Sequence, residues 1–134
     1  MQWFGGQAVS LAINYTHAAE FAEADYAPFI VNGTEYGEVR QYGNFSFLRV
    51  YEAGHEVPFY QPIASLEMFR RVISGIDLAD GEQALTANYS SPGTANATHT
   101  EPYVALPSET ASSSTDPSSA ASTTAAPQII QWDS

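Results

Sequence analysis

The last third of this 134-residue sequence most limits what the chain can fold into. From about Asn88 to Pro127 the residues are mostly Ser, Thr, Ala and Pro, with few large apolar side chains. Such a segment cannot bury enough surface to offset the entropy of ordering its backbone. We therefore expect one foldable unit at residues 1–81 and a disordered Ser/Thr/Ala/Pro-rich tail at residues 82–134. A unit of that size is near the lower limit for an independent core.

The charge balance argues against two classes of partner. The chain contains 15 Asp and Glu against 4 Arg, with no Lys, which gives a formal net charge of −11. This charge repels a phosphate backbone and anionic lipid, so we expect neither nucleic-acid binding nor polybasic membrane docking. The sequence contains no cysteine, so disulfides and thiolate metal sites are excluded within it.

Every asparagine lies in the Asn-x-Ser/Thr acceptor pattern of N-glycosylation: Asn14, Asn32, Asn44, Asn88 and Asn96. One such triplet alone can be an unused surface or strand asparagine, but five out of five favours passage through the secretory pathway. The first residues, MQWFGG, have neither the charged nor the apolar region of a signal peptide. We therefore expect the true N-terminus to lie upstream.

Apolar spacing predicts a helix, a hairpin and a further strand. The i, i+3, i+4, i+7 pattern indicates a helix over residues 6–21. Asn32-Gly33 between apolar runs predicts a hairpin with strands at residues 29–31 and 36–42. Residues 45–51 have apolar groups on both faces, which favours a buried strand over an edge strand.

A second helix is expected after this strand. Pro62 suits its first turn and Gly75 its C-cap. Apolar residues recur every three or four positions between them, at Ile63, Leu66, Phe69, Ile73 and Ile76. Arg70 and Arg71 are interpreted as a pair near the negative end of the helix dipole rather than a binding site.

His55 is the candidate functional residue. It follows the predicted strand at residues 45–51, and catalytic groups of α/β sheets gather outside the carboxyl ends of strands. Small Ala53 and Gly54 let the backbone pass close to another group, and Pro58 stiffens the exit from the loop. From position alone, a half-buried histidine that caps a loop is the competing interpretation.

Residues 47–62 read FLRVYEAGHEVPFYQP, and this string resembles the active-site histidine motif of the serine carboxypeptidases, A-G-H-x-V-P-x-x-Q-P. The match has no gap and is far more specific than a lone G-x-S-x-G. Residues 3–8, WFGGQA, resemble the N-W-x-G segment that follows the family's catalytic aspartate. The two matches span the foldable part at about the family's spacing.

The resemblance implies an α/β fold: the C-terminal portion of an α/β-hydrolase, with its last strands, histidine loop and closing helix. In the family's chain order of Ser, Asp and His, His55 takes third place as general base. The full-length enzyme would release C-terminal residues from peptides through this triad, without a cofactor, as a secreted or vacuolar protein. Glu56 stands where the family places a residue of the leaving-group pocket; a solvated loop charge is the alternative.

The departures from the family pattern matter as much. No G-x-S-x-G occurs, and the position of the family's aspartate lies ahead of Met1. Asp25 is the only aspartate before His55, and it is interpreted as a surface charge. Since two triad members are absent, we expect these 134 residues alone to have no peptidase activity.

Metal binding and membrane attachment are not expected. His17 and His99 are predicted to face solvent and show no metal-ligand spacing with His55, so a small zinc module ranks last. Residues 108–126 resemble an O-glycosylated stalk, and an unmodified flexible terminus is the alternative. Some fungal members of the family are lipid-anchored, but Ile129-Ile130 is too short for a GPI signal. A noncatalytic secreted glycoprotein with a surface stalk is the second hypothesis for the chain.

Overall fold

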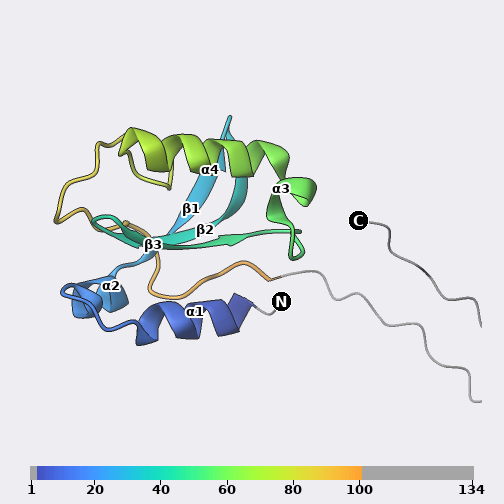
Figure 1. Cartoon of the computed structure of the whole chain (residues 1–134). Helices are drawn as coiled ribbons and strands as arrows, with labels where there is room; N and C mark the ends of the chain where they lie inside the picture. Colours follow the sequence, from blue (N-terminus) through green and yellow to red (C-terminus); the bar gives the residue numbers. More distant parts are fainter. Residues whose placement is uncertain (1–2, 101–134) are drawn as a thin grey trace, which may run out of the picture. The chain divides into compact units, whose positions relative to one another are not determined.

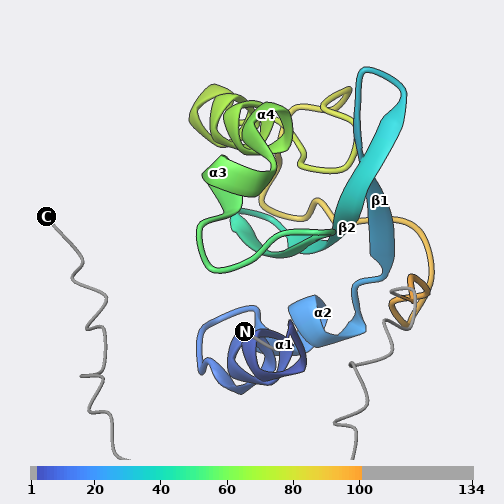
Figure 2. The ribbon, with the colours of Figure 1, turned by 90° about the vertical axis from the view of Figure 1, so that its right-hand side faces the viewer.

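The computed structural model describes residues 3–100. The strands form one antiparallel sheet in the order β1-β2-β3. Helix α4 lies over one face of the sheet, and α1 and α2 lie over the other (Figures 1 and 2). The elements, in chain order, are α1 (Trp3–Ala12), α2 (Ala18–Glu23), β1 (Tyr26–Val31), β2 (Thr34–Tyr42), β3 (Phe45–Val50), α3 (Val57–Tyr60) and α4 (Pro62–Ser74).

The hairpin prediction is confirmed by β1 and β2. The two residues between them, Asn32 and Gly33, have φ values of 51° and 78°. Positive φ at both central positions defines a type I′ turn, whose twist matches that of the paired strands. β2 is the central strand of the sheet, and all its residues from Gly37 to Gln41 are buried.

The single helix expected over residues 6–21 is wrong, because two shorter helices replace it. α1 begins already at Trp3, and residues 13–17 connect it to α2. This connection, INYTH, consists of residues with modest helix propensity, so little opposes a break there. Phe21 of α2 is 1% exposed and packs edge-on against the Phe45 ring, with 4.7 Å between the ring centroids. Tertiary packing therefore fixes α2 under the sheet.

The prediction of a buried strand at residues 45–51 is wrong, since β3 is an edge strand and most of its residues are half-buried. Within residues 3–100, no strand pairs with its outer side. By contrast, the outer side of β1 is closed, because the Ile30 N–H donates to the Ala79 carbonyl over 2.8 Å. The helical layers explain the two-faced apolar pattern of β3: Gly6 of α1 lies against Phe47, and Leu48 belongs to the core on the α4 side.

The predicted second helix is confirmed as α4, with Pro at its first turn and Gly75 in the left-handed conformation (φ 65°) as C-cap. Its apolar stripe, however, faces away from the sheet. Ala64, which is fully buried, and the partly buried Met68 pack on the sheet instead. We call the outward-facing residues the α4 stripe; they are 53–70% exposed and comprise Ile63, Leu66, Phe69, Val72 and Ile73.

Arg71 is not simply one member of a helix-end pair, because its side chain is 4% exposed and crosses the core side of α4. Its guanidinium donates to the carbonyls of Leu78, Ala79 and Ile30 and to the Glu67 carboxylate, over 2.6–2.9 Å. These bonds join α4 to β1 and to the loop that follows the helix. Arg70 is the exposed member of the pair.

The loop after α4 is organised around Asp77, which is fully buried. One carboxylate oxygen accepts the backbone N–H groups of Asp80 and Gly81, and the other accepts that of Gln83 over 2.8 Å. Burial acts to raise the pKa of Asp77, but these backbone hydrogen bonds outweigh it and lower the pKa below its ordinary value of 3.8. The carboxylate is therefore the stable form in the folded chain.

Replacing Asp77 with alanine is expected to lower the free energy of unfolding by about 2–4 kcal/mol, because buried N–H groups lose their acceptor. Asp80→Ala is the matched control, because Asp80 is exposed and accepts only the N–H of Glu82 among the described residues. It should change the free energy of unfolding far less. Since the folded pKa is depressed, this contribution is complete above the unfolded pKa and is lost as the pH falls below about 4. Urea titrations at two pH values, with Asp77→Asn for comparison, measure it; equal stability of both alanine variants would contradict the assignment.

The packed region extends beyond the expected limit at Gly81. One compact unit includes all the described residues, 3–100. Thr94 exchanges two backbone hydrogen bonds with Tyr26 of β1. Glu38 accepts the N–H groups of Thr98 and His99, the former over 2.7 Å. The physical reason is that buried charges on the α1 face of the sheet bind this segment through its backbone, which needs no large apolar side chain. The predictions for residues 101–134 lie outside the described residues.

Candidate functional site

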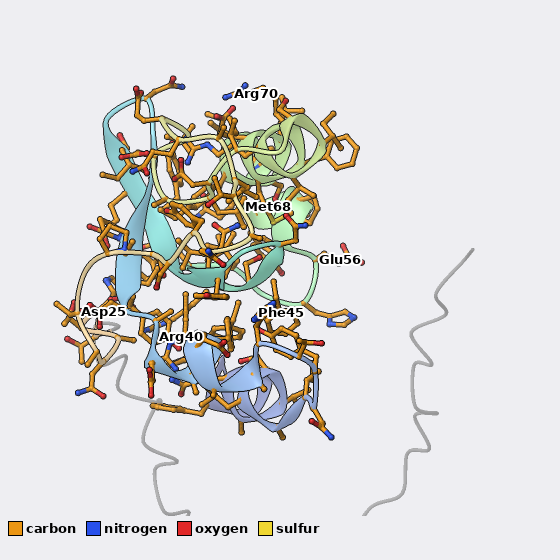
Figure 3. The ribbon with its side chains drawn as sticks, turned by 90° about the vertical axis from the view of Figure 1, so that its left-hand side faces the viewer. Asp25, Arg40, Phe45, Glu56, Met68 and Arg70 are labelled. Carbon is orange, nitrogen blue, oxygen red and sulfur yellow. The ribbon has the colours of Figure 1, made fainter. Side chains whose placement is uncertain are left out.

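The functional candidate, His55, lies where the sequence predicts it, on the loop after the C-terminal end of β3. Its side chain is exposed, and so is that of the next residue, Glu56. Figure 3 shows Glu56 pointing away from the ribbon at the outer edge of the loop. The loop therefore presents a histidine and a carboxylate side by side to the surroundings.

Hydrogen bonds fix both ends of this loop. At its start, Tyr51 is 7% exposed, and its hydroxyl donates to the Glu35 carboxylate over 2.8 Å. At its end, the Gln61 amide donates to the Tyr51 carbonyl over 3.1 Å. Burial, followed by the bond to Glu35, holds the pKa of Tyr51 well above its ordinary value of 10.0, so the phenol remains a donor. Glu52 then turns the chain with a positive φ of 51°.

Gly54 passes close to an aromatic ring, as the small residues before His55 indicated. A Cβ atom at position 54 would lie 2.9 Å from Cε2 of Tyr60, so any larger residue would displace that ring. Tyr60 ends α3, a single helical turn where the sequence predicts a loop. Its ring meets that of Phe59 edge-on, with centroids 5.2 Å apart. The His55 loop thus folds back on an aromatic pair.

No hydrogen bond or ion pair joins the His55 ring to another residue in the part of the chain that the structure describes. Asp25 is not placed to orient it. β1 and β3 are both antiparallel to β2 and hence parallel to each other. Asp25 precedes β1 and His55 follows β3, so they lie at opposite ends of the sheet. Figure 3 likewise shows Asp25 and Glu56 on opposite sides of the molecule.

Of the other two histidines, His17 is open to solvent as expected, with its side chain 45% exposed, whereas His99 is half-buried. The His17 ring lies 5.5 Å from that of Tyr42 and 3.3 Å from a carboxylate oxygen of Glu20. The His99 ring stacks on that of Tyr51 at 3.6 Å between centroids, and it lines a cavity of about 310 Å³ behind the His55 loop. Among residues 3–100, no group of three or more His, Asp or Glu side chains is placed to hold a metal ion.

The side chains of the five acceptor asparagines are all exposed: Asn14, Asn32, Asn44, Asn88 and Asn96. They lie in turns and loops outside the helices and strands. Each is therefore open to modification. Within the same described range, no helix is both long and apolar enough to cross a membrane.

Sequence reasoning missed the polar residues that hold the site. Glu35 and Gln61 fix the His55 loop through their hydrogen bonds to Tyr51, yet in the sequence they lie 16 and 10 residues away from Tyr51. Arg49 and Glu38 form a buried ion pair at 3.5 Å on the α1 face. The available signal was the charges within the strands, Glu38 and Arg40 at alternate positions of β2 and Arg49 on β3, because a charge on a covered sheet face needs a partner.

The chain matches known proteins over the region that contains this loop. Residues 1–75 match the serine carboxypeptidase family. The chain is 56% identical over 99 residues to "Carboxypeptidase S1 homolog A" of Arthroderma otae, a match that covers 72% of this chain and 15% of that protein. The protein of the same name from Trichophyton rubrum is 48% identical over 100 residues, with the same two shares.

"Carboxypeptidase S1" of Penicillium janthinellum is 46% identical over 71 residues, which cover 53% of this chain and 17% of that protein. The chain thus spans only about a sixth of the length of these relatives. No solved structure matches it. The family implies an α/β-hydrolase fold, and the sheet between helical layers is consistent with part of one. The chain belongs to the serine carboxypeptidase family.

Proposed function

We propose that this chain supplies the general-base histidine of a serine-type carboxypeptidase that releases C-terminal residues from peptides. The observation that supports this most is the position of His55. The residue is exposed beyond the C-terminal end of β3, on a loop held at both ends by hydrogen bonds. It also stands inside the ungapped motif of residues 47–62.

The chemistry would follow the serine–histidine–aspartate pattern. As a serine hydroxyl attacks the scissile carbonyl, a ring nitrogen of His55 takes its proton. The peptide C–N bond breaks, the leaving amino acid receives that proton, and an acyl-enzyme remains. His55 then takes a proton from water, whose oxygen attacks the ester, and returns it to the serine. The serine and the aspartate would come from family segments outside these 134 residues.

The surface supports membership in a larger domain. The α4 stripe exposes five large apolar side chains on one helix face, and β3 presents its outer side without a partner strand in the described region. Both features are characteristic of surfaces that pack against further protein. Since no serine motif is present in the sequence, these residues alone are expected to be inactive.

Glu56 is proposed to line the pocket of the leaving residue. It is adjacent to His55 and exposed, and no hydrogen bond or ion pair holds its side chain among residues 3–100. A carboxylate at this place would favour substrates with a basic C-terminal residue. Replacing it with glutamine should then reduce the preference for Arg over Leu at that position.

A chimera tests the proposed activity. In it, this chain replaces the matching 99-residue segment of the Arthroderma otae homologue. We expect the purified chimera to release C-terminal residues from peptides within about tenfold of the unaltered homologue, because 56% identity preserves the packing of the segment. The 134-residue chain, assayed beside it, should release none.

A folded but inactive chimera would contradict the proposed function. It would favour the second hypothesis, a noncatalytic secreted glycoprotein. We also propose, as part of the carboxypeptidase function, that the protein passes through the secretory pathway to an extracellular or vacuolar destination. This passage is supported by the acceptor asparagines, all of which are exposed.

A further inference from the structure

One acceptor asparagine, Asn44, lines a cavity at the end of the sheet where β2 turns into β3. The cavity has a volume of about 350 Å³, and Asn44 itself lines it together with Tyr15, Tyr42, Phe45 and Ala87. Tyr15 directly follows the acceptor Asn14, and Ala87 directly precedes the acceptor Asn88. Segments that are far apart in the sequence thus form the walls of a cavity that one acceptor lines and that two others adjoin in sequence.

Packed rings and a backbone hydrogen bond shape this cavity. The Tyr15 and Phe45 rings lie 4.8 Å apart between centroids, and Figure 3 places Phe45 between the sheet and the helices on its α1 side. On the other side, the Gly43 N–H donates to the Tyr89 carbonyl over 2.8 Å, which fixes the loop that contains Asn88. The walls are mostly aromatic, and the Asn44 side chain stands exposed at the rim.

An aromatic cavity with an acceptor asparagine on its rim fits an amphipathic ligand attached to that asparagine. The pyranose ring of N-acetylglucosamine has apolar C–H faces that stack on aromatic rings, and hydroxyls that remain in water. The cavity volume is near the lower end of the roughly 300–1,000 Å³ of small-molecule sites, which is room for the first sugar of a glycan. Three half-buried rings otherwise leave apolar surface open to solvent.

We propose that Asn44 is N-glycosylated and that its first N-acetylglucosamine packs on Tyr15, Tyr42 and Phe45. This inference rests on the passage through the secretory pathway proposed above. Asn44 precedes β3 and His55 follows it, so the glycan lies at the opposite end of the sheet from the histidine loop. It stabilises the fold without covering the proposed active site.

Asn32 provides the matched control. It is also exposed, but it lies at the tip of the β1–β2 hairpin, where a Cβ atom on the neighbouring Gly33 would meet nothing within 4 Å. A glycan there has no aromatic wall to contact. Two variants of the full chain are therefore informative, each with four of the five acceptor asparagines replaced by glutamine, so that only Asn44 or only Asn32 remains.

The experiment compares the thermal midpoint (Tm) of each variant in two forms. The first form is secreted from a eukaryotic host and trimmed by an endoglycosidase to a single N-acetylglucosamine; the second is made in bacteria without a glycan. We expect the sugar to raise Tm by about 3–6 °C at Asn44, the effect of one good aromatic contact in a domain of this size, and by under about 1 °C at Asn32.

Variants of Tyr15 identify the contact. Tyr15→Ala should abolish the sugar-dependent shift at Asn44. Tyr15→Phe should retain it, since the Tyr15 hydroxyl has no hydrogen-bond partner within residues 3–100. If Tyr15→Ala does not fold, nuclear Overhauser effects between sugar protons and the Tyr15 or Phe45 ring in the Asn44-only form provide the independent test.

Equal shifts at Asn44 and Asn32, or no such Overhauser effects, would overturn the inference. The inference would also be overturned if Asn44 were unmodified in its variant while Asn32 was glycosylated in the other. That outcome would still agree with the proposed passage through the secretory pathway. If neither asparagine is modified after secretion from the eukaryotic host, both the inference about Asn44 and the proposed passage through the secretory pathway are contradicted. Mass spectrometry of the intact variants separates these cases.

Discussion

In the chimera with the Arthroderma otae homologue, replacing His55 with alanine is expected to lower kcat by about 10⁴ to 10⁶ with little change in KM. Removing a triad base leaves the serine as a neutral alcohol of low nucleophilicity, and only the oxyanion hole and substrate binding still accelerate the reaction. Because the side chain is exposed and lacks hydrogen bonds to residues 3–100, its removal should not disturb the fold. Steady-state hydrolysis of a blocked dipeptide gives both constants.

His17 is the control for this variant. It is a histidine on the same chain, packed against Tyr42 at the end of the sheet away from His55. Alanine at position 17 should leave kcat within about threefold of that of the chimera, because it removes no group that exchanges a proton with substrate. If both variants lost activity equally, or if neither did, His55 would not be the base.

Replacing Arg71 with methionine is expected to lower the free energy of unfolding of the chain by about 3–5 kcal/mol. The guanidinium is buried and donates to three backbone carbonyls and to Glu67, so its loss leaves buried acceptors without donors. Methionine keeps much of the volume, so the effect reports the hydrogen bonds rather than a cavity. Urea denaturation followed by circular dichroism, at low micromolar concentration, measures it.

Arg70→Met is the control that distinguishes the loss of the Arg71 hydrogen bonds from the loss of one positive charge on α4. Arg70 also binds Glu67, with a shortest distance of 2.6 Å, but its side chain is 54% exposed and donates to no backbone carbonyl among residues 3–100. An exposed pair adds little to stability, so this variant should unfold at the same urea concentration as the unaltered chain. An Arg71→Met variant that is equally stable would contradict the role of Arg71 as the link between α4 and β1.

Local signals predicted the parts of the fold that depend on neighbouring residues. Asn32-Gly33 identifies the hairpin because only a few residue types tolerate positive φ at both positions of the turn. Gly75 marks the end of α4 for the same reason, with a φ of 65°. The place of His55 after β3 also followed from the sequence, since a strand pattern that stops at a glycine turn fixes it.

The parts of the fold that the sequence did not predict depend on contacts between residues far apart in the sequence. The apolar spacing of Ile63, Leu66 and Phe69 predicts a helix correctly, but it does not indicate that the sheet contacts the face with Ala64 instead. The packing of the segment around Thr98 depends on Glu38, 60 residues earlier, and composition alone made that segment resemble a tail. Likewise, the tyrosine that anchors the histidine loop bonds to Glu35 across the sheet.

The central claim is that His55 activates a serine once the rest of the family's domain is present. Covalent labelling of the chimera by a fluorophosphonate tests this most directly, because the reagent reports serine activation independently of the residue preference of the pocket. We predict one label per molecule, placed on the serine of the homologue's segment, and a labelling rate at least about 100-fold lower after His55→Ala. A folded chimera that takes up no label, or one that is labelled equally fast without His55, would contradict the account.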